Sequence, residues 1–497
     1  MDIQSNAVIV VVGAGAMGAG VAQVAAMAGH PVRVIDRDGA ALARGRASVE
    51  AGLASLARRG SLPAADQAAV VERIVWTTDL AQASDAALAI EAIVERLDVK
   101  AALFAQLAAV TSPAAILASN TSSLSIQALA AAVPHPERFL GLHFFNPVPA
   151  MKLVEVIGAV ATSPQVLEAA SRLMRGWGKS AVAVRDVPGF IVNRVARPYY
   201  AEGFAALAEG APAAAIDHAL TAAGGFRMGP LALADLIGHD VNYAVASSVY
   251  EAYDGATRFR PQPAQQALVE AGRLGRKSGS GVYDYAGDLP APDLVPAAPR
   301  PNLVIEARRL GELAPLAAAA SDAGVALSFD VAFAPDILEV DGIRIAAGDG
   351  RSLASRTDAD VLLDAARDWT TAKTLVMTAV DDHAAATAAG FVQAIGKNAL
   401  QIADRPGLLV LRTLAQLANA AADAAGDEVA SLDGIDQAMV LGANHPEGPL
   451  AWARRYGVQR LAAALTHIAD ETADPLYRPS PFLLAAATST TQEMDHV

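Results

Sequence analysis

The residues with the clearest potential for proton transfer are His143 and Glu155, in the segment LGLHFFNPVPAMKLVEVI. This segment predicts a strand, a proline-containing turn and a second strand. If the turn is centred on Pro149, antiparallel pairing places His143 opposite Glu155 on one face of the sheet. A carboxylate beside an imidazole fixes its tautomer and stabilises its protonated form, as a base that deprotonates a hydroxyl requires. A hairpin with a chance surface ion pair would show the same spacing.

Two further segments contain polar residues that could contact a ligand. The run SNTSSLS (119–125) follows an apolar strand and contains Asn120 and Ser122. It is expected at the carboxyl end of that strand, where α/β sheets bind ligands, although a loop that caps the next helix would look the same. Asn193 lies in PGFIVNR, near the start of a long predicted helix, where an asparagine is often only a solvated residue.

The segment GAGAMG (13–18) fits the dinucleotide-binding pattern GxGxxG. Its glycines allow a tight turn, close approach of a pyrophosphate, and close packing of helix against strand. The segment follows a strand and opens a helix, whose N-terminus stabilises phosphate charge. A merely structural turn is the alternative. The predicted cofactor contacts in this segment are Gly13, Gly15, Ala16, Met17 and Gly18.

An acidic residue, Asp36, ends the next predicted strand and completes a βαβ unit. Its carboxylate would accept hydrogen bonds from the adenosine ribose and would repel a 2′-phosphate, so NAD is predicted rather than NADP. Arg37 beside it weakens this preference, since an arginine can accommodate a 2′-phosphate.

The elements that would position these residues alternate between strand and helix. This alternation predicts a Rossmann-type, doubly wound and mostly parallel sheet over residues 1–185. An all-α domain is expected over 186–286 and a proline-rich linker over 287–302. The predicted strands of the first domain are 6–12, the run ending at Asp36, 74–77, 87–92, 116–119, 139–145 and 153–157.

The second half of the chain contains an internal repeat. WGKSAVAVRDVPGFIVNR (177–194) matches IGKNALQIADRPGLLVLR (395–412), and GFRMGPLALAD (225–235) matches NHPEGPLAWAR (444–454), at an offset of 218–219 residues. The repeat predicts a second helical domain over 404–497. Residues 303–403 are too few for a full copy and lack GxGxxG, so a shortened α/β domain without a nucleotide site is expected there.

The repeat also bears on Asn193. Its counterpart is Leu411, while the neighbouring Pro-Gly and Arg persist in both copies. Packing alone therefore does not require the asparagine, which indicates a chemical role in the first copy.

Composition excludes several classes of function. The 497 residues contain no cysteine, which rules out disulfides, iron–sulfur clusters, Cys-ligated zinc and a thiol nucleophile. The 38 basic and 52 acidic side chains give a formal charge of −14, which argues against a nucleic-acid partner. The histidines show no metal-ligand spacing, so no metal is predicted. A charge-free stretch over 3–32 is broken by glycines and predicts buried elements rather than a membrane span, so no membrane partner and a cytoplasmic location are expected.

Together these features resemble the 3-hydroxyacyl-CoA dehydrogenase family, closely over residues 1–286. The duplicated helical domain resembles longer bacterial members, including those that act on 3-hydroxyadipyl-CoA in phenylacetate catabolism. The segments that carry the resemblance are VVGAGAMGAGVAQ (11–23), IEAIVERLDVK (90–100), ASNTSSLSI (118–126), GLHFFNPVPAMKLVEV (141–156), DVPGFIVNR (186–194) and GRLGRKSGSGVYDY (272–285).

The resemblance implies a role for each matching residue. His143 matches the catalytic histidine and Glu155 its carboxylate partner, while Ser122 and Asn193 match residues that contact the reacting oxygen. The cofactor contacts implied by the resemblance are Asp36, Glu95, Lys100 and Asn120.

The implied reaction is NAD-dependent oxidation of an (S)-3-hydroxyacyl-CoA to the 3-oxoacyl-CoA, in fatty-acid β-oxidation or a similar aromatic catabolic route. The family binds NAD and acyl-CoA between its two domains and usually dimerises through the helical domain. The fused second helical domain could replace that contact, so a homodimer and a pseudo-dimeric monomer both stay open.

Basic residues are candidates for the anionic substrate. Arg58, Arg59 and Lys100 could lie near it, although solvated helix faces explain them equally well. Arg197 and Arg227 could pair with a distal carboxylate of an adipyl-type substrate. Two other functions remain possible: a dehydrogenase of small free β-hydroxy acids, and a non-catalytic NAD-binding scaffold.

Overall fold

The computed structural model describes residues 3–307, 310–330 and 336–488. It forms two compact units, the first made of residues 1–194 and 427–443, the second of residues 195–426 and 444–497. The sequence-based domains are continuous stretches of chain, whereas the first unit includes 17 residues, 427–443, from the second helical repeat. This exchange of a segment has no local signal in the sequence.

The first unit is built on an eight-stranded sheet of order β3-β2-β1-β4-β5-β6-β7-β8. All neighbours are parallel except β6 and β7, so the predicted Rossmann-type, mostly parallel sheet is confirmed. Its strands are β1 (Ile9–Val12), β2 (Val32–Ile35), β3 (Ile74–Thr77), β4 (Leu88–Glu91), β5 (Ile116–Ser119), β6 (Phe139–Phe144), β7 (Leu153–Gly158) and β8 (Ser180–Arg185). The edge strand β8 is absent from the strands predicted from the sequence.

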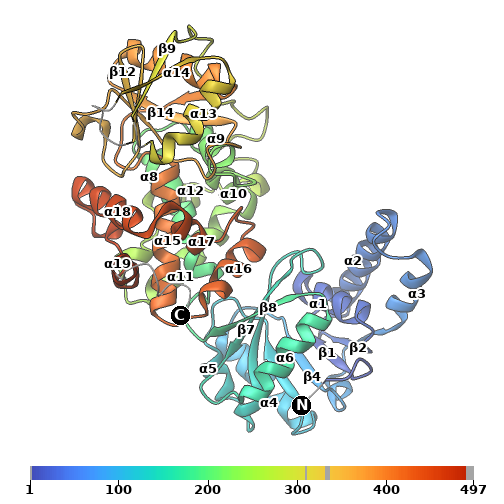
Figure 1. Ribbon diagram of the computed structural model, residues 1–497. Helices are drawn as coiled ribbons and strands as arrows, with labels where there is room; N and C mark the ends of the chain where they lie inside the picture. Colours follow the sequence, from blue (N-terminus) through green and yellow to red (C-terminus); the bar gives the residue numbers. More distant parts are fainter. Residues whose placement is uncertain (1–2, 308–309, 331–335, 489–497) are drawn as a thin grey trace. The chain divides into compact units, whose positions relative to one another are not determined.

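The helices of this unit alternate with the strands along the chain (Figure 1). They are α1 (Ala16–Met27), α2 (Gly39–Arg58), α3 (Ala64–Glu72), α4 (Leu97–Val110), α5 (Ile126–Ala130), α6 (Pro164–Gly176), the start of α7 (Val192–Val195), and α16 (Leu432–Gly442). All four residues of β1 are buried, as expected for a parallel strand covered on both faces. None of the described helices is long and apolar enough to cross a membrane.

The second unit contains a mixed sheet of order β10-β9-β11-β12-β13-β14-β15, with helices beside it. The predicted α/β segment in this half is confirmed, although three of its strand pairs are antiparallel. The strands are β9 (Leu303–Ala307), β10 (Ala326–Asp330), β11 (Ile337–Val340), β12 (Ile343–Ala347), β13 (Val361–Leu363), β14 (Thr374–Ala379) and β15 (Asn398–Gln401).

The helical part of the second unit combines both helical repeats (Figure 1). The helices of the two repeats in this unit are α8 (Arg197–Ala208), α9 (Ala213–Ala222), α10 (Pro230–Ile237), α11 (His239–Ala252), α12 (Pro263–Glu270), α15 (Val410–Gly426), α17 (Pro449–Tyr456), α18 (Val458–Thr472) and α19 (Pro481–Thr488). The helices α13 (Ala314–Asp322) and α14 (Asp382–Ala394) pack on the mixed sheet instead. The almost wholly buried α15 packs against α8, α17, α18 and α19. In the first copy the helix is interrupted between α7 and α8, where Pro198 lies in the first turn of α8. In the second copy the corresponding residue is Gln416, and α15 is one continuous helix.

The segment predicted as a linker has neither helix nor strand between residues 287 and 302, but it is tied to the second sheet. The amide of Val295 donates to the carbonyl of Ala399, and the side chain of Gln393 bonds the backbone at Val295, Pro296 and Ala298. This segment is therefore attached to the second sheet by hydrogen bonds and is not a free linker.

The segment 272–285 folds around one buried carboxylate. Asp235 accepts hydrogen bonds from the amides of Val282 and Tyr283, from the hydroxyl of Tyr285, and pairs with His239. A Cβ at Gly275 or Gly281 would overlap Asp235. The motif GRLGRKSGSGVYDY is thus explained by packing of the first helical domain.

The same local contacts occur in both copies of the repeat. Lys179 donates to the carbonyl of Met151 at 2.7 Å, in the connection between β6 and β7, and Lys397 donates to that of Ala372 at 2.7 Å, between β13 and β14. In each copy the Pro-Gly is followed by a residue in the left-handed region, Phe190 and Leu408, both at φ +49°. The matched sequences therefore encode the same two features in each copy: a turn after the Pro-Gly, and a hairpin whose connection accepts a hydrogen bond from a lysine (the lysine-capped hairpin).

The strand register identifies the residues of the second copy that correspond to His143 and Glu155. Ser180 pairs with Leu153 and its counterpart Asn398 pairs with Thr374, so Val376 occupies the position of Glu155. The amide of Asp364 bonds the carbonyl of Val376, which places Asp364 at the position of His143. The second copy thus keeps a carboxylate, on the opposite strand, and lacks the histidine.

Asp364 holds the start of α15. Its carboxylate accepts hydrogen bonds from the amides of Leu409, Val410 and Leu411 at 2.6–2.9 Å. Burial raises the pKa of Asp364 to about 6, although these hydrogen bonds oppose the rise.

We expect Asp364→Ala to lower the free energy of unfolding by about 3 kcal/mol, because buried amides lose their acceptor. The loss should be greater at pH 4 than at pH 7. The folded-state pKa is raised, so the native state gains stability at low pH that it loses as the pH rises through about 6. Urea denaturation at both pH values measures this, with the exposed Asp322→Ala as control. An equal loss at the two pH values would contradict the assignment.

Candidate active site

The glycine-rich turn between β1 and α1 has the shape that a dinucleotide requires. Gly13 adopts φ +110°, and a Cβ there would overlap the carbonyl of Ala92. A Cβ at Gly18 would overlap the carbonyl of Gly13, whereas the space around Gly15 is open to 4 Å. Gly13 and Gly18 are therefore fixed by turn and packing, and Gly15 leaves room for a ligand to reach the backbone.

The N-terminus of α1 is available for an anion. Its N-cap, Gly15, offers no side-chain oxygen to the first amides of the helix, which include those of Ala16 and Met17. Asp36 lies next to this turn, because one carboxylate oxygen accepts a 2.8 Å hydrogen bond from the amide of Ala14 and the other accepts from Asp38. The turn, the uncapped helix and the carboxylate together fit NAD.

The hairpin β6–β7 pairs His143 with Glu155, as predicted from the turn position. Nδ1 of His143 lies 2.6 Å from Oε2 of Glu155, and the two residues are 6% and 0% exposed. The rings of Phe145 and Phe190 lie 4.4 Å and 5.7 Å from the imidazole, measured between centroids. This is a buried pair in an apolar setting, which excludes the alternative of a chance surface ion pair.

Glu155 also holds the backbone that carries Asn193. Its second oxygen, Oε1, accepts hydrogen bonds of 3.0 Å from the amides of Ile191 and Val192, at the start of α7. One carboxylate thus links the imidazole to the strained turn after Gly189. No local pattern in the sequence indicates this second role of Glu155.

The loop after β5 is organised by Glu95. Oε1 of Glu95 accepts hydrogen bonds from the hydroxyl of Thr121 at 2.6 Å and from the amide of Ser122 at 2.8 Å. Burial raises the pKa of Glu95, but the hydrogen bonds and the charge of Lys100 outweigh it and hold that pKa below its usual value. Glu95 is therefore an ionised clamp on the loop. Ser125 caps α5 as the alternative interpretation expected, so the run SNTSSLS serves as a helix cap and supplies this loop.

Lys100 is almost completely buried and forms ion pairs with Glu91 and Glu95, so the idea of a solvated helix face is wrong for this residue. Glu91 also accepts a 2.7 Å hydrogen bond from the hydroxyl of Ser119. Sequence reasoning missed Glu91 and Thr121. An acidic residue at the end of the apolar strand LAIE was the available signal.

The structure brings three more predicted residues to this end of the sheet. The side-chain amide of Asn193 lies 3.4 Å from the carbonyl oxygen of Ser122. The side-chain oxygen of Asn120 accepts a 2.9 Å hydrogen bond from the amide of Phe144, next to His143. Ser122, Asn193 and the imidazole therefore belong to one connected group of contacts.

Arg59 is not part of that group. It is exposed at the end of α2, and its guanidinium donates to the hydroxyl of Ser55, one turn earlier. The structure shows no contact between Arg59 and the described residues of the loop after β5. Within the residues that the structure describes, no cluster of three or more His, Asp or Glu side chains could hold a metal ion.

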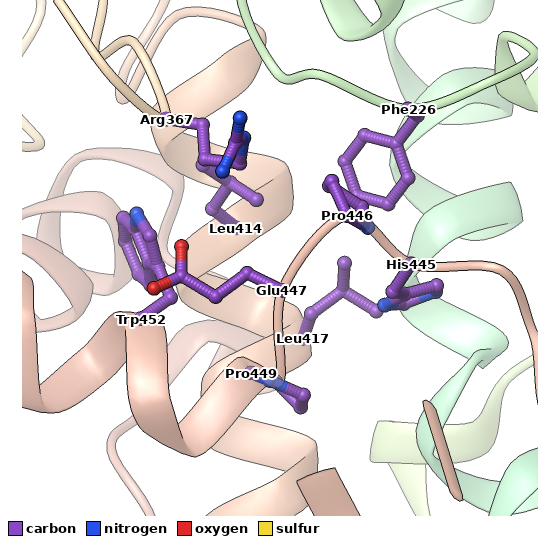
Figure 2. A pocket seen from close by; sticks show the side chains of 9 residues that line it. All are labelled: Phe226, Arg367, Leu414, Leu417, His445, Pro446, Glu447, Pro449 and Trp452. Atoms are coloured by element: carbon purple, nitrogen blue, oxygen red, sulfur yellow. The ribbon is translucent and has the colours of Figure 1, made fainter. Parts of the chain in front are cut away.

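A small pocket lies in the second unit, and none of the residues above lines it. Figure 2 shows its mainly apolar walls, with Arg367 and Glu447 as the charged members and His445 and Trp452 among the rings. Burial lowers the pKa of His445 to about 4, so the imidazole is neutral. The volume of about 10 Å³ is enough for roughly one water molecule, far less than a small-molecule site needs.

Comparison with known proteins agrees with this geometry. The NAD-binding domain of 3-hydroxyacyl-CoA dehydrogenases matches residues 8–187, and the C-terminal domain of these enzymes matches twice, at 189–285 and 407–491. The chain belongs to the 3-hydroxyacyl-CoA dehydrogenase family. The double match also confirms the helical repeat.

Three relatives illustrate the similarity. The 3-hydroxyadipyl-CoA dehydrogenase of Escherichia coli K12 is 42% identical over 480 residues, 96% of each chain. A probable 3-hydroxybutyryl-CoA dehydrogenase of Deinococcus radiodurans is 43% identical over 55% of this chain and 99% of its own length. A crystal structure of a 3-hydroxybutyryl-CoA dehydrogenase from E. coli K12 superposes with a TM-score of 0.88 at 41% identity, over 97% of this chain and 98% of the other.

We expect Gly15→Ala to raise the Kd for NADH by about tenfold or more, because the methyl group enters the open space where a pyrophosphate would meet the backbone. Nothing in the protein opposes the methyl group, so the urea midpoint should not change. Fluorescence titration with NADH measures the affinity. Gly176→Ala adds a methyl group to equally open space at the end of α6 and serves as control. Equal affinities for the two variants would exclude Gly15 from the cofactor site.

Proposed function

We propose that the protein catalyses reversible, NAD-dependent oxidation of an (S)-3-hydroxyacyl-CoA to the 3-oxoacyl-CoA. The buried pair of His143 and Glu155 carries this proposal, because it is a positioned general base in an apolar setting. NAD, when bound, supplies the hydride acceptor. The protein's own residues handle the proton and orient the substrate.

His143 takes the hydroxyl proton through Nε2, since Nδ1 faces Glu155. The carboxylate of Glu155 stabilises the positive charge that then appears on the imidazole. It cannot turn away during the reaction without releasing the amides of Ile191 and Val192. Phe145 and Phe190 keep water from the ring, which strengthens the electrostatic interaction.

Ser122 and Asn193 orient the reacting oxygen in this proposal. Glu95 fixes the backbone of Ser122, and Asn193 reaches toward that backbone from α7. The proposed cofactor contacts of the glycine-rich turn are Gly13, Gly15, Ala16, Met17 and Gly18, and those outside it are Asp36, Glu95, Lys100 and Asn120. Glu95 and Lys100 would act largely by holding the loop that faces the cofactor.

For the substrate we propose a thioester with a distal carboxylate, as the name of the E. coli relative suggests. The proposed setting is β-oxidation or a similar aromatic route such as phenylacetate catabolism, in the cytoplasm, where NAD and CoA thioesters are available.

We expect His143→Ala to lower kcat for reduction of acetoacetyl-CoA by about 10²–10⁴-fold, because the reaction loses the positioned imidazole that donates the proton in this direction. Binding of NADH should survive, since the glycine-rich turn is unchanged. NADH consumption and NADH titration measure the two effects, with the half-exposed His135→Ala as control. Unchanged turnover in His143→Ala would remove this residue from the mechanism.

Two other functions predict different results in the same assay. A dehydrogenase of free β-hydroxy acids would turn over acetoacetate as well as its CoA thioester. A binding-only protein would bind NADH and consume none with either compound.

A further inference from the structure

The segment 427–443 comes from the second helical repeat but belongs to the unit that holds His143 and Asn193. It is tied to the edge strand β8 by backbone contacts. The amide of Arg185 donates to the carbonyl of Val429 at 2.9 Å, and its guanidinium donates to the carbonyl of Asp427 at 2.8 Å. These bonds attach the segment to the edge of the sheet.

Two glycines on α16 bring the helix close to the site. A Cβ at Gly434 would touch Val182 on β8 at 3.1 Å. A Cβ at Gly442 would overlap with the side chains of Leu153 and Val192, at 2.5 Å and 2.9 Å. It would also lie 3.6 Å from the ring of Phe145. Val192 begins α7, and Phe145 lies against the imidazole of His143. The end of α16 therefore rests directly on residues that flank the reacting groups.

An ion pair completes the contact. The guanidinium of Arg194, a residue with 2% exposure, pairs with the carboxylate of Asp427. Arg194 follows Asn193 directly, on a helix of only four residues. So short a helix has little hydrogen bonding of its own, and its position depends on outside contacts. Glu155 holds its first amides and Asp427 holds its arginine.

The same ion pair occurs in the second unit with the copies exchanged. Arg412, 218 residues after Arg194, pairs with Glu209, 218 residues before Asp427. Likewise α9 of the first copy packs on β14, as α16 of the second copy packs on β7. Each helical repeat thus lends one acidic residue and one helix to the sheet of the other copy, as in an isologous interface.

From these contacts we propose that segment 427–443 is a positioning element for the reaction, and that Asp427 positions Asn193 through Arg194. The inference rests on the proposed function of the site. Within the described part of the chain, the carboxylate of Asp427 pairs with Arg194 and its carbonyl accepts from Arg185, so Asp427 acts through another residue and not on the substrate. The second repeat then supports the active site of the first copy, although it has no histidine of its own at the corresponding position.

The exchanged ion pair in the second unit supplies a control. Asp427 and Glu209 have side chains that are 56% and 44% exposed, and each pairs with a buried arginine. Only Asp427 pairs with an arginine that directly follows an asparagine, because the residue before Arg412, at position 411, is leucine. Glu209 also pairs with Arg405 at 2.9 Å, and Arg412 also pairs with the buried Glu202 at 2.9 Å. Neutralising Glu209 therefore removes one charge from a larger ion-pair network in which no asparagine precedes the arginine.

The test measures kcat, KM, NADH affinity and thermal midpoint for Asp427→Asn and Glu209→Gln in the full chain, with acetoacetyl-CoA and 3-oxoadipyl-CoA. We expect Asp427→Asn to lower kcat by about 10- to 100-fold, as for a small displacement of a reacting group, with little change in KM or NADH affinity. Glu209→Gln should keep kcat within about twofold at a similar thermal midpoint. Asp427→Glu, which keeps the carboxylate, should restore most of the activity.

Each other outcome overturns the inference. Wild-type kcat in Asp427→Asn would show that the ion pair does not position Asn193. Equal losses in Asp427→Asn and Glu209→Gln would show a general effect on the fold. A wild-type protein that consumes no NADH with either thioester would instead overturn the proposed function, and this inference with it.

Discussion

A single buried carboxylate, Glu155, joins the chemistry of this protein to its architecture. A carboxylate taken out of water is stable only when its oxygens are fully hydrogen-bonded. Glu155 meets this condition by binding an imidazole with one oxygen and two backbone amides with the other. The register of β6 and β7, the left-handed residue Phe190 and the start of α7 must therefore all be correct together. A shift of one residue in the hairpin would turn Glu155 to the other face of the sheet.

The second copy shows which part of this arrangement is structural. It keeps the lysine-capped hairpin, the Pro-Gly turn, the left-handed residue and a buried carboxylate that accepts the first amides of the helix. It lacks the histidine and the asparagine. Asp364 occupies the position of the histidine, and its carboxylate accepts hydrogen bonds from the amides at the start of α15. The second copy therefore keeps the buried carboxylate that the helix start needs, although it lacks the catalytic residues. The helix start needs a buried acceptor in both copies, and either strand of the hairpin can supply it.

Local features of the sequence predicted much of the site. The pairing of His143 with Glu155 followed from a short hairpin whose turn fixes the register, and the glycine spacing followed from steric limits on one turn. Other features depend on contacts between residues far apart in the chain and leave no periodic signal. Examples are the burial of Lys100 between two carboxylates and the packing of α16 on β7 and β8. The edge strand β8 was missed although it is as long as β6 and β7, because it is only partly buried and pairs within the sheet with β7 alone.

Covalent linkage explains how two copies could diverge without losing the shared interface. Contacts between separate subunits must be kept by both partners at once, because one sequence supplies both sides of an isologous interface. Within one chain the two sides are encoded separately, and the tether gives each a high effective concentration for the other. The second copy could then lose its glycine-rich turn, histidine and asparagine, provided that it retained the surfaces that support the first copy. Asp427, Gly434 and Gly442 lie on such a surface, and these positions are constrained by the first copy's α7, β7 and β8 rather than by any chemistry of their own.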